Sequence, residues 1–562
     1  MTSPIGVLAL AVVAVSILLS LPLSLPVGPM YWDVFIYYDA ANRILSGQVP
    51  VRDFFTPVGP LGYYLFTGWL MLFPNGQPAI LAHWSLLAVT APVMALILHD
   101  VSSRSRTIAF ALLVPFLLFA LLPFNTRDFY PFPGSEGFGI YNRQVCQALY
   151  VLVAAILFVR RPRTLIAVIG ILMTALFFLK ITGFVAGGII AAFAFLTRRV
   201  SLRMTAVIVA VFAAVLAVLE LTSGLVGRYV TDILLLIQMN SGTLAPRFLQ
   251  SASLNFGVLA PAGLLAALLL WADRDRLASS ASHAWRERDL AGLAGVVDHN
   301  ALWLLVVLFA GILFETQNTG SQALIFLWPV VLSILLRVDR LIARPALLVA
   351  AVGLAAAISL PPAVTVTESA ARAYVGAVKN VPLEHENLKT LGALNMRNEV
   401  STRVAHLLGF YPTHRQLYED MVAVNELPTP VLYSDFDFQI IHLIATDQAI
   451  SSIRALEAAK DIRFDTIMSL NFVNPYPWLM DREAPLHVAI GADPFRAVPT
   501  PGSEEESAVA ATDLVLYPTC PPTTANAELY RMYEAALVGH TRIKLNDCYD
   551  AFVNPKFRSL SN

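Results

Sequence analysis

Charged residues are scarce in this chain of 562 residues, where Asp, Glu, Lys and Arg together make up 14%. A soluble globular protein usually has about 25%. Apolar residues reach 57% instead, and they form uninterrupted runs long enough to cross a hydrocarbon core of about 30 Å. This composition excludes an ordinary soluble protein. It predicts an integral protein of a bacterial inner or plasma membrane, in contact with membrane lipids.

An excess of basic charge is also missing. The 38 Lys and Arg residues are balanced by 39 Asp and Glu residues, which leaves a net charge of −1. Proteins bind nucleic acid mainly through cations that neutralise its phosphates. We therefore expect no nucleic-acid partner.

Cysteine is limited to three residues, which is too few for a disulfide framework. Cys146 begins an apolar run, so we predict that it is buried. Cys520 and Cys548 lie near the C-terminus. They could pair if that region is extracytoplasmic, and two free thiols are the alternative. The C-terminal region also lacks a metal-spaced Cys or His cluster, a phosphate-binding glycine loop and a GxSxG elbow.

The apolar runs predict about eleven transmembrane helices. The first run has no basic n-region and no small-x-small cleavage site, so we interpret it as a retained span. The stretch 60–73 is too short to cross comfortably, and we interpret it as an interfacial or re-entrant helix. Tyr229 to Met239 is amphipathic and could lie on the membrane surface. The predicted spans are 5–25, 79–98, 107–123, 144–159, 164–179, 183–197, 204–221, 256–272, 301–314, 322–336 and 345–361.

Arginine is concentrated in one set of alternate loops. The positive-inside rule places these loops in the cytoplasm, so the N-terminus is predicted to be cytoplasmic. We divide the chain into a transmembrane module (1–362, with a first outer loop at 27–78) and an extracytoplasmic, periplasmic domain (363–562). The arginine-rich set comprises Arg104, Arg106, Arg160, Arg161, Arg163, Arg198, Arg199, Arg203, Arg274, Arg276, Arg286, Arg288, Arg337, Arg340 and Arg344.

The region after residue 362 alternates short β-type runs with helical patterns, such as 449–459 and 524–538. This alternation is typical of a small α/β domain. The predicted strands are Pro430–Tyr433, Thr466–Met468, Leu486–Ile490, Leu514–Tyr517 and Arg542–Leu545.

The first outer loop carries ionisable residues directly after the first span. Asp33 lies between aromatic residues, where a carboxylate could take a proton from an acceptor hydroxyl. The alternative is that it caps the helix that follows. Asp39 lies about 120° further round an ideal helix, and it could equally pair with Arg43 at i+4.

This loop resembles the first extracytoplasmic loop of the C-type (GT-C) membrane glycosyltransferases. The likeness rests on an Asp outside the first span, a following aromatic residue, small residues, Gly47, and a proline-rich turn that enters an aromatic helix. By pattern, the nearest groups are the protein O-mannosyltransferases and the aminoarabinose–lipid A transferases. The resemblance implies a polyprenyl-phosphate-sugar donor and Asp33 as the catalytic carboxylate.

Gly59 to Tyr64 is similar to the Pro-Pro-Leu-x-Tyr-Trp segment of that family. The lysine that usually precedes this segment is absent, and we predict that Arg52 supplies the missing positive charge. Tyr38 and Asp39, in the same loop, complete the predicted substrate contacts there.

Further candidates lie in other outer loops. Lys180 separates two apolar runs in a tight turn, where it could snorkel to lipid head groups. Lysine-bearing turns bind the lipid phosphate in GT-C relatives, so we predict that it clamps the donor phosphate. Arg143 could hold the same phosphate or anchor the interface, and both readings stay open. Gln317 and Asn318 suit sugar hydroxyls, although a satisfied polar turn is the alternative.

We therefore predict an inverting glycosyltransferase of the hexosyl or pentosyl kind. It would move a sugar from a polyprenyl-phosphate donor to an extracytoplasmic acceptor, which is a cell-envelope glycan, a lipid or a protein. The scheme requires no cofactor and leaves a divalent metal open. A transporter or flippase is the rival, but it would bury charges in mid-span and repeat its two halves, and neither pattern is present. A third reading is a non-catalytic assembly subunit with a GT-C-like fold.

Overall fold

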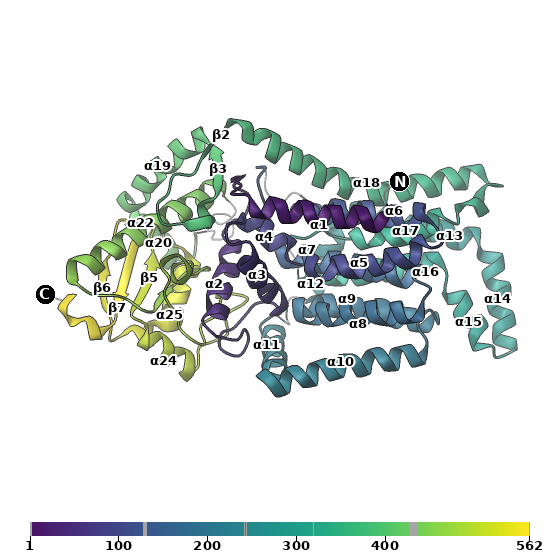
Figure 1. The fold of residues 1–562 in the computed structure, drawn as a ribbon, viewed down its shortest axis with the longest axis horizontal. Helices are drawn as coiled ribbons and strands as arrows, with labels where there is room; N and C mark the ends of the chain where they lie inside the picture. The colour runs from purple at the N-terminus through teal and green to yellow at the C-terminus, as the bar shows by residue number, and fades with distance from the viewer. Residues whose placement is uncertain are drawn as a thin grey trace.

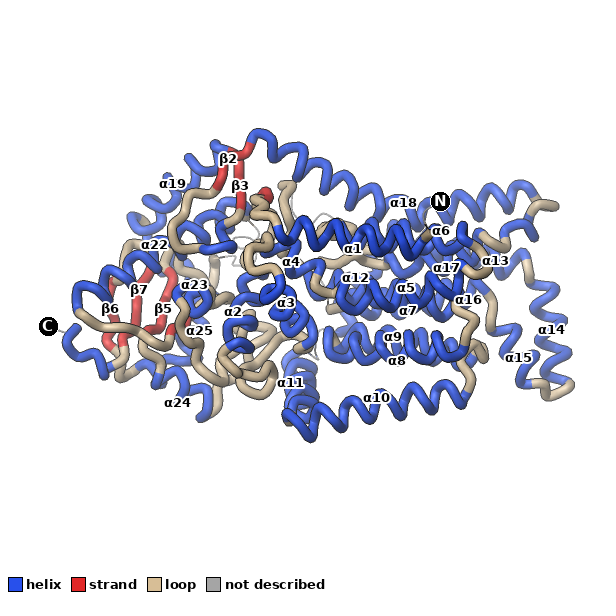
Figure 2. Tube along the Cα trace, viewed as in Figure 1, coloured by secondary structure: helices blue, strands red, loops and turns tan. Residues whose placement is uncertain are grey.

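The apolar runs form helices that lie alongside one another in a bundle, and the C-terminal region lies at one end of it (Figure 1). This computed structural model describes residues 3–127, 132–240, 242, 244–317, 320–427 and 435–560. Helix dominates, and the strands lie toward the end opposite α14 and α15 (Figure 2). The bundle helices are α1 (Pro4–Ser20), α5 (Leu87–Ser102), α6 (Arg106–Leu121), α7 (Ile140–Phe158), α8 (Pro162–Leu179), α9 (Ile181–Leu196), α10 (Leu202–Ser223), α13 (Phe256–Ala272), α16 (Asn300–Glu315), α17 (Trp328–Leu335) and α18 (Pro345–Gly376).

Length and hydropathy identify four of the described helices as able to cross a membrane alone, namely α7, α8, α10 and α18. Three bent pairs bring the number to seven. These pairs are α4 (Pro78–Trp84) with α5, α12 (Leu244–Leu254) with α13, and α15 (Leu290–Val297) with α16. Each segment predicted as a span contains helix, but several of these helices are shorter than eighteen residues. A largely helical membrane protein is therefore supported, and the total of about eleven spans stays a prediction.

α7 is the central helix of the bundle. It is 89% buried over its most apolar stretch, whereas α10 is not buried at all over its own. α10 packs on α8 and α11 along one side, and an apolar helix that leaves most of its surface uncovered by protein is suited to face lipid. Because α7 is enclosed, the polar residues in its first turns are held inside the protein.

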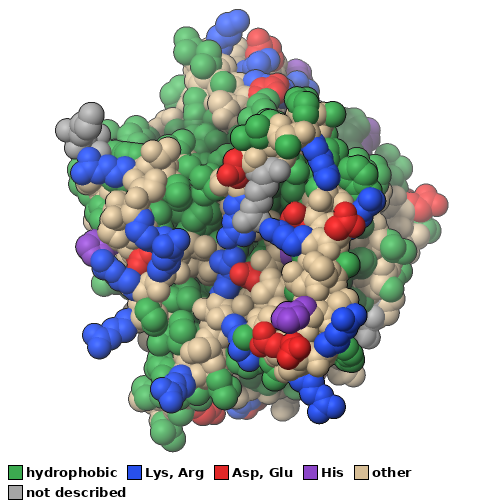
Figure 3. Space-filling view, turned by 90° about the vertical axis from the view of Figure 1, so that its right-hand side faces the viewer, with side chains coloured by type: hydrophobic (Ala, Val, Ile, Leu, Met, Phe, Trp, Pro, Cys, Tyr) green, Lys and Arg blue, Asp and Glu red, His purple; other side chains and the backbone are tan. Residues whose placement is uncertain are grey.

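The arginine-rich loops gather at the end of the bundle away from the C-terminal region. Arg104 donates to the Phe158 carbonyl at 2.5 Å, and Arg199 donates to the Leu157 carbonyl at 3.3 Å, so loops far apart in sequence meet there. Figure 3 views this end and shows many basic side chains across it. The membrane orientation assigned to this end remains a prediction from charge.

One short helix agrees with its predicted length, and one long helix does not. α3 (Leu61–Leu72) has 12 residues, or about 18 Å of helix, which is too short to cross the membrane straight. α18 runs on to Gly376 through Pro361 and Pro362, so the predicted boundary at 362 falls inside a helix. Each proline removes only its own N–H, and the flanking hydrogen bonds can carry the helix past it.

The C-terminal region contains a four-stranded mixed sheet in the order β4-β5-β7-β6. β4 (Ile467–Ser469) pairs parallel with β5 (Leu514–Pro518). β7 (Tyr549–Val553) pairs antiparallel with both β5 and β6 (Thr541–Lys544). Helices α22 (Phe436–Lys460), α24 (Ser503–Ala511) and α25 (Thr524–Leu537) accompany the sheet. Three predicted strands are confirmed in place, while β7 was not predicted.

One predicted strand, Leu486–Ile490, is wrong. Its backbone pairs with the first outer loop instead, because the His487 N–H donates to the Asp53 carbonyl at 2.6 Å and the Ile490 N–H to that of Phe55 at 3.1 Å. These bonds to a distant loop take the place of a ladder within the sheet. The predicted strand Pro430–Tyr433 lies outside the described residues.

A second, small sheet joins the segment after α1 to the segment after α18. β3 (Leu394–Arg397) pairs parallel with β1 (Leu25–Pro26), just after α1, and antiparallel with β2 (Asn380–Pro382). Cys520 and Cys548 form a disulfide, which resolves the alternative left open by the sequence. Cys146 is a buried free thiol, as predicted.

Candidate active site

The first outer loop folds into α2 (Asp33–Leu45), which lies between the bundle and the C-terminal region (Figure 1). Every residue from Val34 to Ala41 is buried, so the helix is covered on all sides. Trp32 holds its first turn. The backbone N–H of Trp32 donates to Gln439 Oε1 at 3.2 Å, and its indole ring packs on Phe472 with 4.9 Å between the ring centroids.

Asp33 is the first residue of α2, but it does not cap the helix. The N-cap is Trp32, with no side-chain capping bond, and Asp33 Oδ1 is buried without a hydrogen-bond partner. Burial raises the pKa of Asp33 to about 8, and the charges of Arg143 and Arg496 offset part of that rise. A desolvated carboxylate with an open acceptor site is suited to taking a proton from a ligand.

A cavity of about 540 Å³ opens beside Asp33. Its walls come from α2, the first outer loop, α7, the α8–α9 turn, α11 (Leu225–Asn240), α12, the end of α16 and residues 491–497. Three predicted site residues line it, namely Asp33, Lys180 and Gln317. The ionisable and tyrosine side chains in its wall are Asp33, Tyr37, Tyr63, Tyr141, Lys180, Tyr229, Asp232, Arg247, Asp493 and Arg496.

Lys180 forms the one-residue break between α8 and α9, with extended backbone angles. Its Nζ donates to Asn142 Oδ1 at 2.9 Å and to the Gln317 carbonyl at 3.3 Å. It also lies 5.0 Å from the centroid of the Tyr141 ring. These contacts hold the ammonium group at the cavity wall, where it could meet a phosphate.

Two further cations in the wall were not predicted. Arg247 donates to Gln317 Oε1 at 3.0 Å, and Arg496 forms an ion pair with Asp493 at 2.8 Å. Arg247 had a signal in the sequence, because cations are sparse in the outer loops. Arg496 had none, because its loop reaches the cavity only through the docking of the C-terminal region.

Asp232 is a second carboxylate in the wall that was not predicted. Its Oδ2 is buried without a hydrogen-bond partner, and burial raises its pKa to about 7 against the opposing charge of Arg228. A ligand hydroxyl or other donor would satisfy this oxygen. Within the described residues, no group of three or more His, Cys, Asp or Glu side chains is arranged to hold a metal ion.

The structure places three predicted contacts away from the cavity. Arg52 is 43% exposed and forms an ion pair with Asp53 at 2.7 Å. Asp39 pairs with Arg43 at 2.8 Å, which is the i+4 alternative. The Tyr38 hydroxyl meets Thr390 Oγ1 at 3.2 Å. Arg52 and Asp39 are held by partners close in sequence. Tyr38 is held by the C-terminal region, which covers α2. Asn318 lies outside the described residues.

Arg143 is fully buried in the first turn of α7 and does not line the cavity. Its guanidinium donates to the carbonyls of Phe138 at 2.6 Å and Glu136 at 3.0 Å, and to Asn125 Oδ1 at 3.0 Å. A carboxylate oxygen of Glu136 lies 3.6 Å from it. These contacts favour a structural role for Arg143, which fastens residues 136–138 beside the cavity.

Arg143→Met should therefore destabilise the protein rather than weaken donor binding. Removing one partner of a buried ion pair costs about 3–5 kcal/mol, so the thermal midpoint of the purified protein should fall by several degrees. Adding Glu136→Gln should restore part of the loss. A variant with unchanged thermal stability and weakened donor binding would instead assign Arg143 to the phosphate.

No family model matches the sequence, and no curated protein matches it. Among solved structures, the chain aligns with ArnT from Cupriavidus metallidurans in the apo state at 10% identity and a TM-score of 0.37, over 98% of this chain and 97% of that one. It also aligns with the archaeal oligosaccharyltransferase AglB from Archaeoglobus fulgidus, in complex with an inhibitory peptide and a dolichol-phosphate. There the identity is 13% and the TM-score 0.30, over 96% of this chain and 72% of that one.

TM-scores below 0.5 describe a loose likeness in overall arrangement. The roles of individual residues therefore rest on the geometry of the cavity.

Proposed function

We propose that this protein is a membrane glycosyltransferase that moves a sugar from a polyprenyl-phosphate donor to an acceptor hydroxyl. One observation carries the proposal. An open, desolvated carboxylate, Asp33, shares a cavity with three cations, Lys180, Arg247 and Arg496. General-base catalysis and neutralisation of a phosphate leaving group need these two kinds of group in one place.

In the proposed reaction, Asp33 accepts the proton of the acceptor hydroxyl as its oxygen attacks the anomeric carbon. The bond between that carbon and the phosphate oxygen breaks, and polyprenyl phosphate leaves with the bonding electrons. Attack from the face opposite the phosphate inverts the configuration. Lys180, Arg247 and Arg496 would stabilise the charge that grows on the phosphate.

The composition of the wall suits both ends of such a donor. Apolar residues of α9, α11 and α12 contribute Val185, Ile233 and Leu244 beside the cations, and they could accommodate the start of an isoprenoid chain. The open oxygen of Asp232 would meet a hydroxyl of the sugar. The C-terminal region supplies Asp493 and Arg496, and we propose that it also shapes the acceptor side.

The experiment that tests this function supplies purified protein with radiolabelled polyprenyl-phosphate sugars, and with acceptors extracted from cells that lack the gene. We expect release of polyprenyl phosphate together with label in an extracted acceptor. Analysis of the glycoconjugate missing from those cells would identify the sugar. Donor binding without turnover on any extract would overturn the enzyme assignment and favour a transporter or an assembly subunit.

A further inference from the structure

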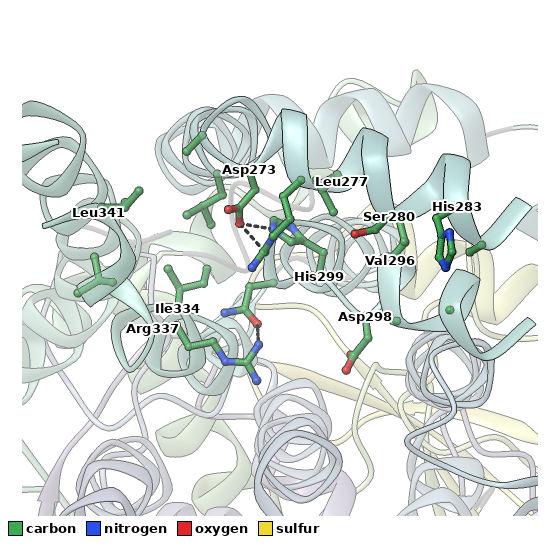
Figure 4. Close-up of a pocket in the computed structure, with 18 of the residues that line it drawn as sticks. Asp273, Leu277, Ser280, His283, Val296, Asp298, His299, Ile334, Arg337 and Leu341 are labelled. Atoms are coloured by element: carbon green, nitrogen blue, oxygen red, sulfur yellow. Dashed lines mark hydrogen bonds and ion pairs between the residues drawn. The ribbon is translucent and has the colours of Figure 1, made fainter. Parts of the chain in front are cut away.

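A second large cavity lies at the arginine-rich end of the bundle. The helices α13, α14 and α15 around it lie at the end of the bundle away from α2 (Figure 1). The cavity measures about 760 Å³ and lies between α13, α14 (Arg274–Arg286), α15, the start of α16, α17 with the turn after it, and the start of α18. Figure 4 shows apolar side chains, among them Leu277, Val296 and Ile334, interspersed with polar and ionisable ones. A cavity with both kinds of wall suits an amphipathic ligand.

Two carboxylates of the cavity wall are already satisfied by the protein. Asp298 forms an ion pair with Arg199 at 2.7 Å. Asp273 accepts from Arg276 at 3.0 Å, and a ring nitrogen of His299 lies 3.0 Å from the same oxygen (Figure 4). These acids therefore have internal cations or donors to neutralise them.

The third carboxylate, Asp289, accepts the Ala291 N–H at 2.9 Å and so caps α15. Two more arginines line the cavity. Arg337 donates to the neutral Asn300 Oδ1 at 3.3 Å. Arg344 is exposed and forms no ion pair with any residue that the structure describes. Because Arg199 neutralises Asp298 and Arg276 neutralises Asp273, the charges that remain in the wall are those of Arg337, Arg344 and Asp289. Their sum is positive, which favours an anion.

The surroundings of the cavity indicate where the anion comes from. Large apolar side chains next in sequence to its wall are exposed, namely Trp271 at 53%, Trp285 at 76%, Leu290 at 69% and Ile342 at 66%. Exposed tryptophan and aliphatic side chains among arginines are typical of a segment at a membrane interface. Figure 3 shows basic and hydrophobic side chains mixed across this end.

We propose that this cavity binds the phosphate-bearing head group of an anionic phospholipid, in the leaflet on the arginine-rich side. Arg337 and Arg344 meet the phosphate, and the apolar wall receives the glycerol and the first acyl carbons. Basic pockets between helices on the cytoplasmic side are suited to anionic head groups. The group that the arginines recognise is a phosphate, which either a lipid head group or free inorganic phosphate could supply.

The test uses the full chain in nanodiscs that contain phosphatidylcholine with a minor fraction of phosphatidylglycerol. Native mass spectrometry of the released protein measures which lipid it retains. The wild type should retain phosphatidylglycerol in preference to phosphatidylcholine. In Arg337→Gln/Arg344→Gln that preference should fall by about five-fold for each arginine removed. Arg344→Gln alone, which breaks no internal ion pair, should show half of the effect on a logarithmic scale.

The matched control is Arg286→Gln/Arg288→Gln, which removes two exposed arginines from the same end without touching the cavity wall. An equal loss in this control would show general surface charge and overturn the site. Titration with inorganic phosphate, in discs of phosphatidylcholine alone and in discs that also contain phosphatidylglycerol, tests the other source. Stabilisation by phosphate that phosphatidylglycerol does not compete with would overturn the lipid. The lipid readout does not depend on sugar transfer, so the two proposals fail separately.

Discussion

Asp33→Asn is expected to lower sugar transfer by about 10²- to 10⁴-fold, the usual contribution of a positioned general base. The amide keeps the size of the side chain but cannot take the acceptor proton. Donor binding should change little, because the cations of the cavity remain. The measurement is turnover of a polyprenyl-phosphate sugar by the purified variant, with donor binding followed in parallel. A fully active Asn variant would refute the assignment of Asp33 as the base.

The pH dependence of the wild type adds a second readout. Only the ionised carboxylate can act as a base, and burial raises the pKa of Asp33 to about 8. We expect kcat/KM to rise about tenfold per pH unit below pH 8 and to level off above it. A flat profile between pH 6 and 9 would contradict this titration.

Thermal stability supplies the control for folding. The pKa of Asp33 is higher in the folded protein than in the unfolded chain, so folding favours the protonated form. The carboxylate therefore costs stability increasingly as the pH rises from about 4 to about 8. Asparagine has no such charge, and Asp33→Asn should gain thermal stability relative to the wild type as the pH is raised. A loss of stability at pH 9 would instead indicate that the variant is damaged.

Lys180→Met is expected to lower kcat/KM by about 10²- to 10³-fold, comparable to the loss of one oxyanion donor. The methionine keeps an apolar side chain of similar length but leaves the donor phosphate without the ammonium group. The matched control is Arg52→Met, which removes a cation of the first outer loop that does not line the cavity. Its activity should stay within about twofold of the wild type, because exposed ion pairs contribute little.

These two variants separate two assignments of the phosphate-binding cation. Arg52 was predicted as the substitute for a lysine missing before Pro60, and the structure leaves it exposed beside Asp53. Lys180 lies in the wall instead, held by Asn142 and Gln317. Equal losses in both variants, or a loss only in Arg52→Met, would contradict the placement of the phosphate at Lys180.

Local patterns predicted much of the helical architecture. The one-residue break at Lys180, the helix at 61–72 and the amphipathic helix that contains Tyr229 follow from hydrophobic periodicity. The position of Asp33 at the start of a helix was predicted as well. The absence of a capping bond was not, because capping depends on where the neighbouring chain directs the carboxylate.

Predictions of contact between distant parts were less successful. Leu486–Ile490 has the pattern of a strand, but its hydrogen bonds go to the first outer loop. Arg143 has the sequence context of a ligand contact, yet its guanidinium is occupied by three carbonyl or amide oxygens. The partners of Leu486–Ile490 are carbonyls more than 400 residues away in the sequence. The partners of Arg143 lie in the irregular loop that precedes α7, whose conformation no periodic pattern predicts.

The sequence by itself determined that this is a helical membrane protein with an α/β region at its C-terminal end, because hydrophobic runs and charge are local properties. It also indicated Asp33, a carboxylate among aromatic residues just after the first span, and Lys180, which separates two apolar runs. Only the tertiary structure brought Arg247, Asp232 and Arg496 to the same cavity and removed Arg52 and Asp39 from it. Arg496 reaches the cavity because residues 484–497 dock against the first loop, through hydrogen bonds between segments hundreds of residues apart that no local pattern specifies.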